Sequence, residues 1–256
     1  AVDNGSADNC GAAITLTLSQ TAFTCADLGA NQVTLTGTDA SNNVSTITAT
    51  VTVEDNIAPI AIAQNVTINL NASGTGSLSA STVDNGSTDN CGNPTVTLSQ
   101  TAFTCADLGA NTVTLTATDA AGNTNTATAT VTIQDVIAPT ITTQNVTVNL
   151  DASGVATITT ADVDNGSSDN CNLSLSLDVT SFTCANIGSN TVTLTGTDGT
   201  NTTTGTATVT VVDNLGPNMV AQNVTVSLDA SGNASTTASA VDNGSADNCG
   251  AAITLT

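Results

Sequence analysis

The feature that most constrains this chain is an internal repeat of about 80 residues, which the sequence shows directly. The same sixteen residues, VDNGSADNCGAAITLT, stand at 2–17 and at 241–256, and close variants stand at 83–91 and 163–171. Pro59, Pro139 and Pro217 mark the joins. We therefore expect a segment of a tandem array with four parts. Residues 1–55 form a partial repeat lacking its first strands, 56–135 and 136–213 are complete repeats, and 214–256 form a second partial repeat.

The hydrophobic period within a repeat is two residues. The stretch NTVTLTATD at 111–119 places Val113, Leu115 and Ala117 on one face and Thr on the other, and TATATVTI at 126–133 alternates in the same way. Such alternation is typical of half-buried antiparallel strands. Turn signals such as ASG and DNG recur about every 8–12 residues, and no segment carries a helical apolar stripe. The pattern predicts an all-β chain of small antiparallel β-sandwiches that follow one another as a rod.

Composition excludes many functions. The chain has 21 Asp and Glu but no Lys, Arg or His, so its formal net charge is −21. Nucleic acids and anionic lipids are bound through cationic side chains, which this chain lacks. Ser-His-Asp sites, His-ligated zinc and Schiff-base lysines are impossible within it. No stretch reaches the 18 apolar residues of a membrane span. We therefore expect no enzyme, no nucleic-acid partner and no membrane insertion.

The order of the strands predicts which acidic segments share one end of a repeat. For repeats to run head to tail, successive strands must alternate in direction. The strands expected at Asn65–Leu70, Gly76–Val83, Thr95–Ser99 and Asn111–Asp119 then bring three segments to one end: the join, the DNGSxDN loop and the last hairpin turn. Their carboxylates are Asp55, Asp84, Asp89, Asp119, Asp135, Asp164, Asp169, Asp198, Asp213, Asp242 and Asp247.

Converging carboxylates without basic partners repel one another, and a hard cation resolves the repulsion. Ca²⁺ accepts six to eight oxygen ligands from carboxylates, amides and backbone carbonyls. The sequence thus predicts a Ca²⁺ site at or near each repeat junction. The alternative is that these Asp and Asn residues only form turns, for which Asn-Gly is a strong signal. The spacing matches neither an EF-hand nor a nonapeptide calcium repeat.

Seven cysteines at fixed places in the repeats indicate disulfides in an oxidising compartment. Inter-repeat pairing would give Cys25–Cys91, Cys105–Cys171 and Cys184–Cys249. Local pairing would give Cys10–Cys25, Cys91–Cys105 and Cys171–Cys184. A strand of about eight residues separates the two ends of a repeat by about 26 Å, whereas a disulfide needs Cα atoms within about 7 Å. This favours the inter-repeat pairs, although a tight hairpin at Ser99–Gln100 would permit the local ones.

The phrases VDNGSxDNCG, FTCADLGANTVTLTATD, TATATVTIxDxIAP and AQNVTVxLDASG together resemble the HYR-like, immunoglobulin-like repeats of very large secreted Bacteroidetes proteins. These include surface adhesins of the gliding-motility type, which the type IX system exports. The resemblance covers the whole chain. It implies an immunoglobulin-like (Ig-like) sandwich, an extracellular, cell-surface location and a stalk or filament role in cell adhesion, with no catalytic residues. The third repeat departs from the pattern, with Asn186 where the others have Asp27 and Asp107.

The sequence supports two hypotheses for the function of this chain, which belong to different classes. The first is a non-catalytic structural stalk or filament segment of a large repetitive adhesin, stiffened by disulfides and Ca²⁺. Its partners would be other copies of the repeat in the same chain, and lateral self-association into a filament is open because Thr-covered edge strands can pair. The alternative is a ligand-binding, ice-binding or glycan-displaying module of an extracellular matrix protein, built on its Thr-x-Thr rows.

Overall fold

The structure is a computed structural model that describes residues 2–250 and 253–256. The described chain falls into two compact units. One contains residues up to 68 together with 76–134, and the other contains 69–75 together with residues from 135 onward. None of the helices among the described residues is long and apolar enough to cross a membrane.

The first unit holds three sheets. Strands β1 (Thr15–Leu18), β2 (Gly29–Thr38) and β3 (Val44–Val53) form an antiparallel sheet in that order. A four-stranded sheet follows in the order β4-β9-β8-β6, and a two-stranded sheet pairs β5 with β7. Their bounds are β4 (Val66–Asn69), β5 (Thr75–Ser77), β6 (Thr95–Leu98), β7 (Ala102–Thr104), β8 (Gly109–Thr118) and β9 (Thr124–Gln134).

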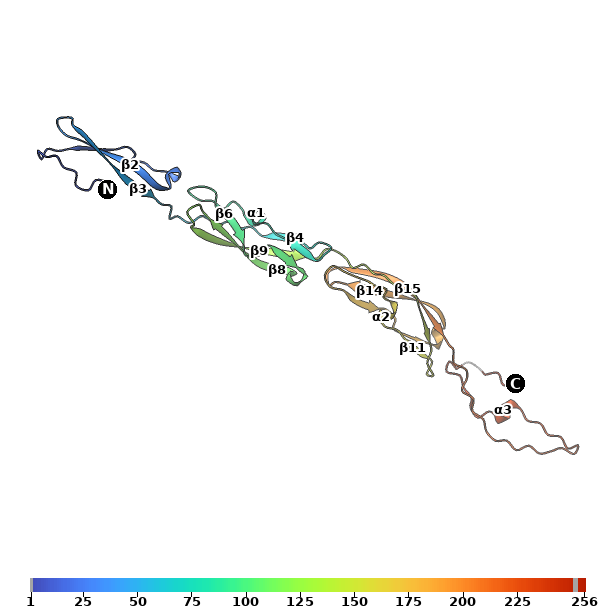
Figure 1. Ribbon diagram of the computed structural model, residues 1–256. Coiled ribbons are helices and arrows are strands. Elements are labelled where there is room, and N and C mark those ends of the chain that lie inside the picture. Colours follow the sequence, from blue (N-terminus) through green and yellow to red (C-terminus); the bar gives the residue numbers. More distant parts are fainter. Residues whose placement is uncertain (1, 251–252) are drawn as a thin grey trace. The chain divides into compact units, whose positions relative to one another are not determined.

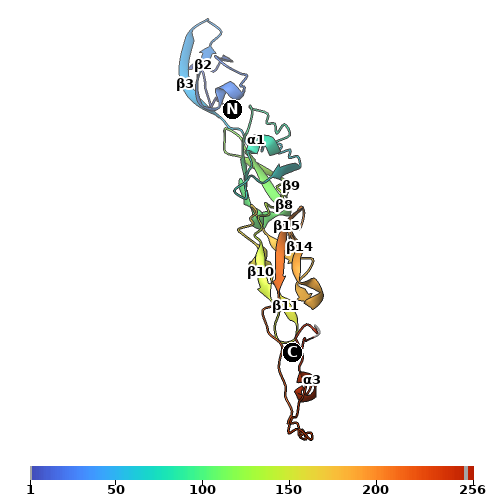
Figure 2. The same cartoon turned by 90° about the vertical axis from the view of Figure 1, so that its right-hand side faces the viewer.

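The second unit repeats this arrangement. Its four-stranded sheet has the order β10-β15-β14-β12, and β11 pairs with β13. The bounds are β10 (Val146–Asn149), β11 (Val155–Thr157), β12 (Ser174–Leu177), β13 (Ser181–Thr183), β14 (Gly188–Thr197) and β15 (Thr202–Val212). Figures 1 and 2 show the long ribbons β8–β9 and β14–β15 with shorter strands beside them.

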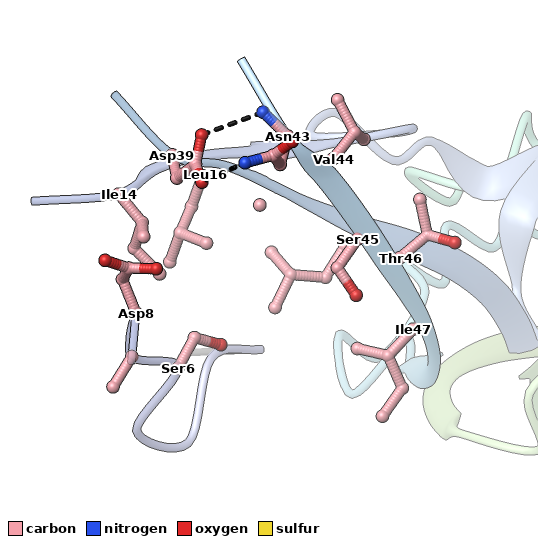
Figure 3. Close-up of a pocket in the computed structure, with 13 residues that line it drawn as sticks. Ser6, Asp8, Ile14, Leu16, Asp39, Asn43, Val44, Ser45, Thr46 and Ile47 are labelled. Atoms are coloured by element: carbon pink, nitrogen blue, oxygen red, sulfur yellow. Dashed lines mark hydrogen bonds between the residues drawn. The ribbon is translucent and has the colours of Figure 1, made fainter. Parts of the chain in front are cut away.

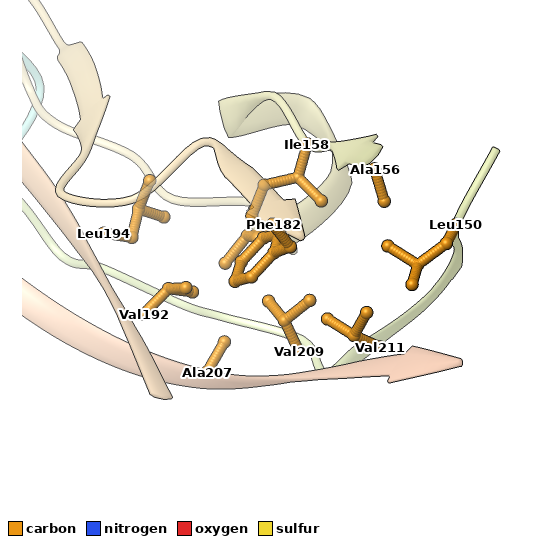
Figure 4. Packing of buried hydrophobic residues seen from close by; sticks show 10 residues of the cluster. Leu150, Ala156, Ile158, Phe182, Val192, Leu194, Ala207, Val209 and Val211 are labelled. Atoms are coloured by element: carbon orange, nitrogen blue, oxygen red, sulfur yellow. The ribbon is translucent and has the colours of Figure 1, made fainter. Parts of the chain in front are cut away.

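The core lies between the four-stranded and two-stranded sheets. In the second unit Phe182 of β13 is 1% exposed and packs with Val192 of β14 and Val209 of β15, both fully buried (Figure 4). Ile158 and Leu150 belong to the same cluster. The alternation predicted from the sequence is thus confirmed: apolar residues of the long strands face inward and Thr faces outward. The chain is an all-β protein of Ig-like sandwich repeats.

Two details differ from the expected topology. Residues 76–83 are not one strand, because β5 ends at Ser77 and a helical turn, α1 (Ala80–Val83), follows. The equivalent turn α2 (Thr160–Val163) has a capping box in which Asp162 accepts from the backbone N–H of Thr159 at 2.7 Å. A third turn, α3 (Ala238–Val241), occupies the same place near the C-terminus. The other difference is that β10 pairs with β15 in parallel, so the sandwich is not wholly antiparallel.

A short 3₁₀ turn carries the second cysteine of each repeat. These turns are η1 (Cys25–Asp27), η2 (Cys105–Asp107) and η3 (Cys184–Asn186). In η2 the carboxylate of Asp107 accepts from the backbone N–H of Thr104 at 2.8 Å. In η3 the amide oxygen of Asn186 accepts from the N–H of Thr183 at the same distance. The third repeat can therefore have Asn186 in place of Asp, because the amide oxygen of Asn accepts the same capping hydrogen bond as the carboxylate of Asp.

Disulfides join cysteines of neighbouring expected repeats. Cys25 bonds to Cys91 and Cys184 bonds to Cys249, with sequence separations of 66 and 65 residues. Cys105 and Cys171 are each held in a disulfide as well. These bonds exclude the local pairs Cys10–Cys25, Cys91–Cys105 and Cys171–Cys184, because at least one member of each has another partner. Cys10 is exposed and free.

Candidate metal centre

Among the described residues, three groups of acidic side chains gather at corresponding places in the repeats. In the first, one carboxylate oxygen of each of Asp55, Asp89 and Asp119 lies within 4.8 Å of the others. The second contains Asp135, Asp169 and Asp198 with the same spacing, and the third contains Asp213 and Asp247 beside Cys249. Cys249 is held in a disulfide, so the third group offers two carboxylates and no thiolate.

Each member of the first group is placed by local backbone structure. Asp55 follows β3 and accepts from the N–H of Ile57 at 3.1 Å, which forms an Asx turn. Asp89 lies in the loop after α1 and accepts from the N–H of Cys91 at 2.8 Å. Asp119 follows β8, and its carboxylate accepts from the backbone and side-chain amides of Asn123 at 2.7 and 2.8 Å. Turn chemistry thus aims three carboxylates at one point.

The burial of these carboxylates is unusual for charged groups. Among the described residues, the buried polar or charged side chains are Asp55, Asp119 and Asp135, with exposed fractions of 9%, 8% and 4%. Burying an ion is costly unless an opposite charge or several hydrogen bonds compensate for it. Because the chain contains no basic residue, no ion pair within it can supply that compensation.

Hydrogen bonds compensate for the burial of some of these carboxylates but leave oxygens of others without a partner. Burial acts to raise the pKa of Asp119, but hydrogen bonds from Asn123 outweigh it and hold the pKa below its ordinary value. In the second group the pKa of Asp198 is lowered in the same way, against burial, by Asn201. Both carboxylates are therefore ionised at neutral pH. Oδ1 of Asp89, Oδ2 of Asp135 and Oδ1 of Asp169 are buried without a hydrogen-bond partner.

An Asn of the Asp-Asn-Cys tripeptide links the loop to the join. Nδ2 of Asn90 lies 3.3 Å from both carboxylate oxygens of Asp55, and Nδ2 of Asn170 donates to Oδ1 of Asp135 at 3.1 Å. Nδ2 of Asn248 donates to Asp213 at 3.2 Å. The sequence analysis did not single out these asparagines. Their recurrence in every copy of the tripeptide was the signal that could have identified them.

Three of the predicted ligands lie outside these groups. Asp84, Asp164 and Asp242 instead accept hydrogen bonds from the backbone N–H groups of Ser87, Ser167 and Ser245 at 3.0–3.1 Å. Hydrogen bonds from the serine side chains are the main cause of their lowered pKa values. Metal binding by this residue of the DNGS phrase stays a prediction, and its carboxylate accepts hydrogen bonds from the loop that it closes.

The remaining acidic groups suit a hard cation. Ligand oxygens bound to one Ca²⁺ each lie about 2.4 Å from the ion, so two of them are at most about 5 Å apart. The carboxylate spacing in the first two groups meets that limit. Oxygen donors and the absence of His favour Ca²⁺ over zinc.

The turn at Asp39 provides an internal contrast. Asp39 accepts from the backbone and side-chain amides of Asn43 at 2.8 and 2.7 Å, as Asp119 does from Asn123 (Figure 3). Around it is an open pocket lined both by apolar side chains, such as Ile14 and Leu16, and by polar ones, which include Asp8. Asp39 belongs to none of the three groups. Asp8 of an Asp-Asn-Cys tripeptide lines the same pocket, but no aspartate of a join does. The turn and the loop therefore do not by themselves bring three carboxylates together, and the join aspartate completes the groups elsewhere.

The chain was compared with known protein families, curated proteins and solved structures. No protein-family model matches the chain, and no curated protein matches it. Among solved structures, the titin I-band fragment I67–I69 gives a TM-score of 0.38 at 10% identity, covering 72% of this chain and 75% of that one. Protocadherin gamma B7 domains 1–4 give 0.32 at 11% identity, covering 83% and 70%.

An endo-fucoidan hydrolase of glycoside hydrolase family 107 also matches, with a TM-score of 0.26 and 16% identity. The match covers 79% of this chain, which spans only 39% of the hydrolase. At these TM-scores none of the similarities carries an argument about what the chain binds or does.

Proposed function

We propose that this chain is a non-catalytic structural segment of the stalk of a large repetitive cell-surface adhesin, outside the cell. The observation that carries the proposal is the covalent linkage between residues 65–66 positions apart, on either side of a join. Each such bond closes a long loop across a join, and long loops gain the most from a disulfide. A chain stapled in this way resists extension, which is the demand on a stalk.

The resemblance to HYR-like Bacteroidetes repeats supplies the more specific part of the proposal, an adhesin of the gliding-motility type. Disulfides persist in oxidising compartments, which supports the extracellular location. The recurrence of the acidic groups and disulfides along the chain also supports a structural role, because a single active site does not require several copies.

We further propose that Ca²⁺ binds the groups of Asp55, Asp89 and Asp119 and of Asp135, Asp169 and Asp198. The cation would neutralise carboxylates that no residue of the chain can neutralise. It would also tie the end of one repeat's last strand to the loop and turn of the next. The resulting stiffening is a second reason to expect a stalk.

Single-molecule stretching of the 256-residue chain tests the stalk. With disulfides intact, residues between Cys25 and Cys91 and between Cys184 and Cys249 are shielded from tension. Reduction should lengthen the unfolded chain by about 230 Å for each disulfide that closes such a loop. Full extension of the oxidised chain to the reduced length would contradict the proposal. The same measurement in Ca²⁺ and in chelator tests the stiffening, with a higher unfolding force expected in Ca²⁺.

A further inference from the structure

The cation group and the disulfide share one tripeptide. Asp89 belongs to the first carboxylate group, and Cys91, two residues later, bonds to Cys25. Oδ2 of Asp89 accepts from the N–H of Cys91, and its Oδ1 is buried without a hydrogen-bond partner. Asn90 between them donates to Asp55. The position of the ligand and the position of the thiol are therefore set by the same three residues.

The second unit shows that such a tripeptide is tightly packed. The same hydrogen bond joins Asp247 to the N–H of Cys249 at 3.1 Å. A Cβ built on Gly154 would lie 2.7 Å from Sγ of Cys184 and 2.9 Å from the backbone oxygen of Asn248. Nδ2 of Asn248 also donates to the backbone oxygen of Asp151 at 3.1 Å. Disulfide, tripeptide and turn leave no room for independent movement.

A buried carboxylate in the second group points to a ligand. Asp135 is 4% exposed, and its Oδ2 has no hydrogen-bond partner. It lies among two further carboxylates within 4.8 Å. An anionic oxygen in that position gains most from a bound cation, because it has no other source of compensation in a chain without basic residues.

We propose that cation binding to Asp55, Asp89 and Asp119 and closure of the Cys25–Cys91 disulfide are thermodynamically linked, so that each strengthens the other. This inference rests on the proposed function, which places Ca²⁺ in that group. Without a cation, repulsion drives Asp89 away from Asp55 and Asp119 and carries Cys91 with it. A bound cation holds Cys91 where Cys25 can reach it. The closed disulfide in turn holds Asp89 in the binding position, so the cation binds at a smaller cost in conformational entropy.

Closure needs an electron acceptor, which a small-molecule disulfide such as oxidised glutathione supplies. The thiolate of one cysteine attacks that disulfide, forming a mixed disulfide and releasing one glutathione thiolate. The second cysteine thiolate then attacks the protein sulfur of the mixed disulfide and releases the second glutathione. Two protein thiols are oxidised, one glutathione disulfide is reduced to two thiols, and the two protons pass to the released thiolates.

Linkage requires both effects to have the same size. If Ca²⁺ raises the equilibrium constant for disulfide closure by some factor, closure raises the Ca²⁺ affinity by that factor. Couplings of this kind are typically about 5- to 150-fold.

The coupling is tested on the whole chain, which is equilibrated in glutathione buffers at fixed pH, with Ca²⁺ or with chelator, and quenched by alkylation. The Cys25–Cys91 fraction is then read by mass spectrometry after a non-tryptic digest, since there is no Lys or Arg.

The expected result is a shift of about fivefold or more toward the disulfide in Ca²⁺. Asp119→Asn should abolish the shift, and Asp39→Asn, the same change in the matching turn outside the group, should keep it. Calorimetry on the oxidised chain and on the Cys25→Ser/Cys91→Ser variant should show the same factor in Ca²⁺ affinity. If that variant fails to fold, the redox equilibrium of the unmutated chain decides the matter alone. Ca²⁺ binding without a redox shift overturns the linkage and leaves the calcium site. Absence of Ca²⁺ binding overturns both and leaves the disulfide-linked stalk.

Discussion

The tripeptide Ala-Phe-Thr occurs at residues 22–24 and again at 102–104, with different outcomes. At 102–104 it forms β7, pairs with β5, and buries Phe103 to 1% exposure. At 22–24 it is not a strand, and Phe23 is only half-buried. The ribbons beside these segments are nonetheless alike, because β2 pairs with β3 in the same register as β8 with β9.

The difference shows which parts of the fold form locally. A long hairpin with alternating Thr and a tight turn forms in both places, and Val33 and Leu35 of β2 are buried, at 0% and 7% exposed. Burial is less complete where no facing two-stranded sheet is present among the described residues. Where that sheet is not present among the described residues, as around β3, Ile47 is 67% exposed. The C-terminal region shows the converse. Val226 and Leu228 are 47% and 70% exposed and form no strand, whereas Leu150 in the equivalent place is 3% exposed.

Truncation of Phe103 and of Phe23 tests most directly whether the two regions differ in packing. Phe103→Ala should lower the free energy of unfolding by about 3–5 kcal/mol, the usual cost of removing a buried aromatic ring. Phe23→Ala should cost less than half as much, because its ring is already partly in water. Denaturant titration followed by circular dichroism measures both. Equal losses would mean that the region around Phe23 is as well packed as the sandwich.

A second test uses one turn in two settings. Gly154 and Gly232 both have positive φ, +71° and +78°. Alanine at Gly232 meets nothing within 4 Å, so we expect only the cost of a left-handed conformation, about 1 kcal/mol. Alanine at Gly154 collides with Cys184 and Asn248 and should cost about 1–3 kcal/mol more. Scanning calorimetry measures the difference between the two variants. Equal losses of stability would show that Cys184 and Asn248 move aside easily.

A third test compares the two acidic turns. At a Ca²⁺ concentration of 100 times Kd, a bound site adds about 2.7 kcal/mol to the free energy of unfolding. Asp119→Asn should remove most of this gain, while Asp39→Asn should preserve it. The readout is the melting temperature with Ca²⁺ and with chelator. If the unmutated chain has the same melting temperature in Ca²⁺ and in chelator, the calcium site is ruled out.

The smallest effect is expected at the 3₁₀ turns. A backbone hydrogen bond from Thr104 is the main cause of the lowered pKa of Asp107. A carboxylate with a lowered folded-state pKa adds stability that is fully present above its unfolded pKa, about 3.8, and is lost as the pH falls through the folded value. Asp107→Asn should therefore leave the melting temperature at neutral pH unchanged, as Asn186 suggests, and should flatten its decline below pH 4. An unchanged decline would show that Asp107 contributes nothing to it.

Much of the candidate site could be predicted from the sequence. Alternating strand direction placed the join, the Asp-Asn-Cys loop and the last hairpin turn at one end, and the structure brings Asp55, Asp89 and Asp119 together. The same reasoning does not show where the carboxylate of Asp84 points, because strand direction places a segment but does not orient a side chain. Hydrogen bonds within the DNGS turn orient Asp84, and these depend on local geometry.

The sequence by itself determined the repeat, the alternating strands and the absence of any basic side chain, because these follow from residue type and spacing. Only the tertiary structure decided which strands become buried, that β10 lies parallel to β15, and that Cys25 bonds to Cys91. Those outcomes depend on contacts between residues more than 60 positions apart. Near neighbours in the sequence determine a ribbon and its turns, but burial and covalent linkage require a partner that the local sequence does not specify.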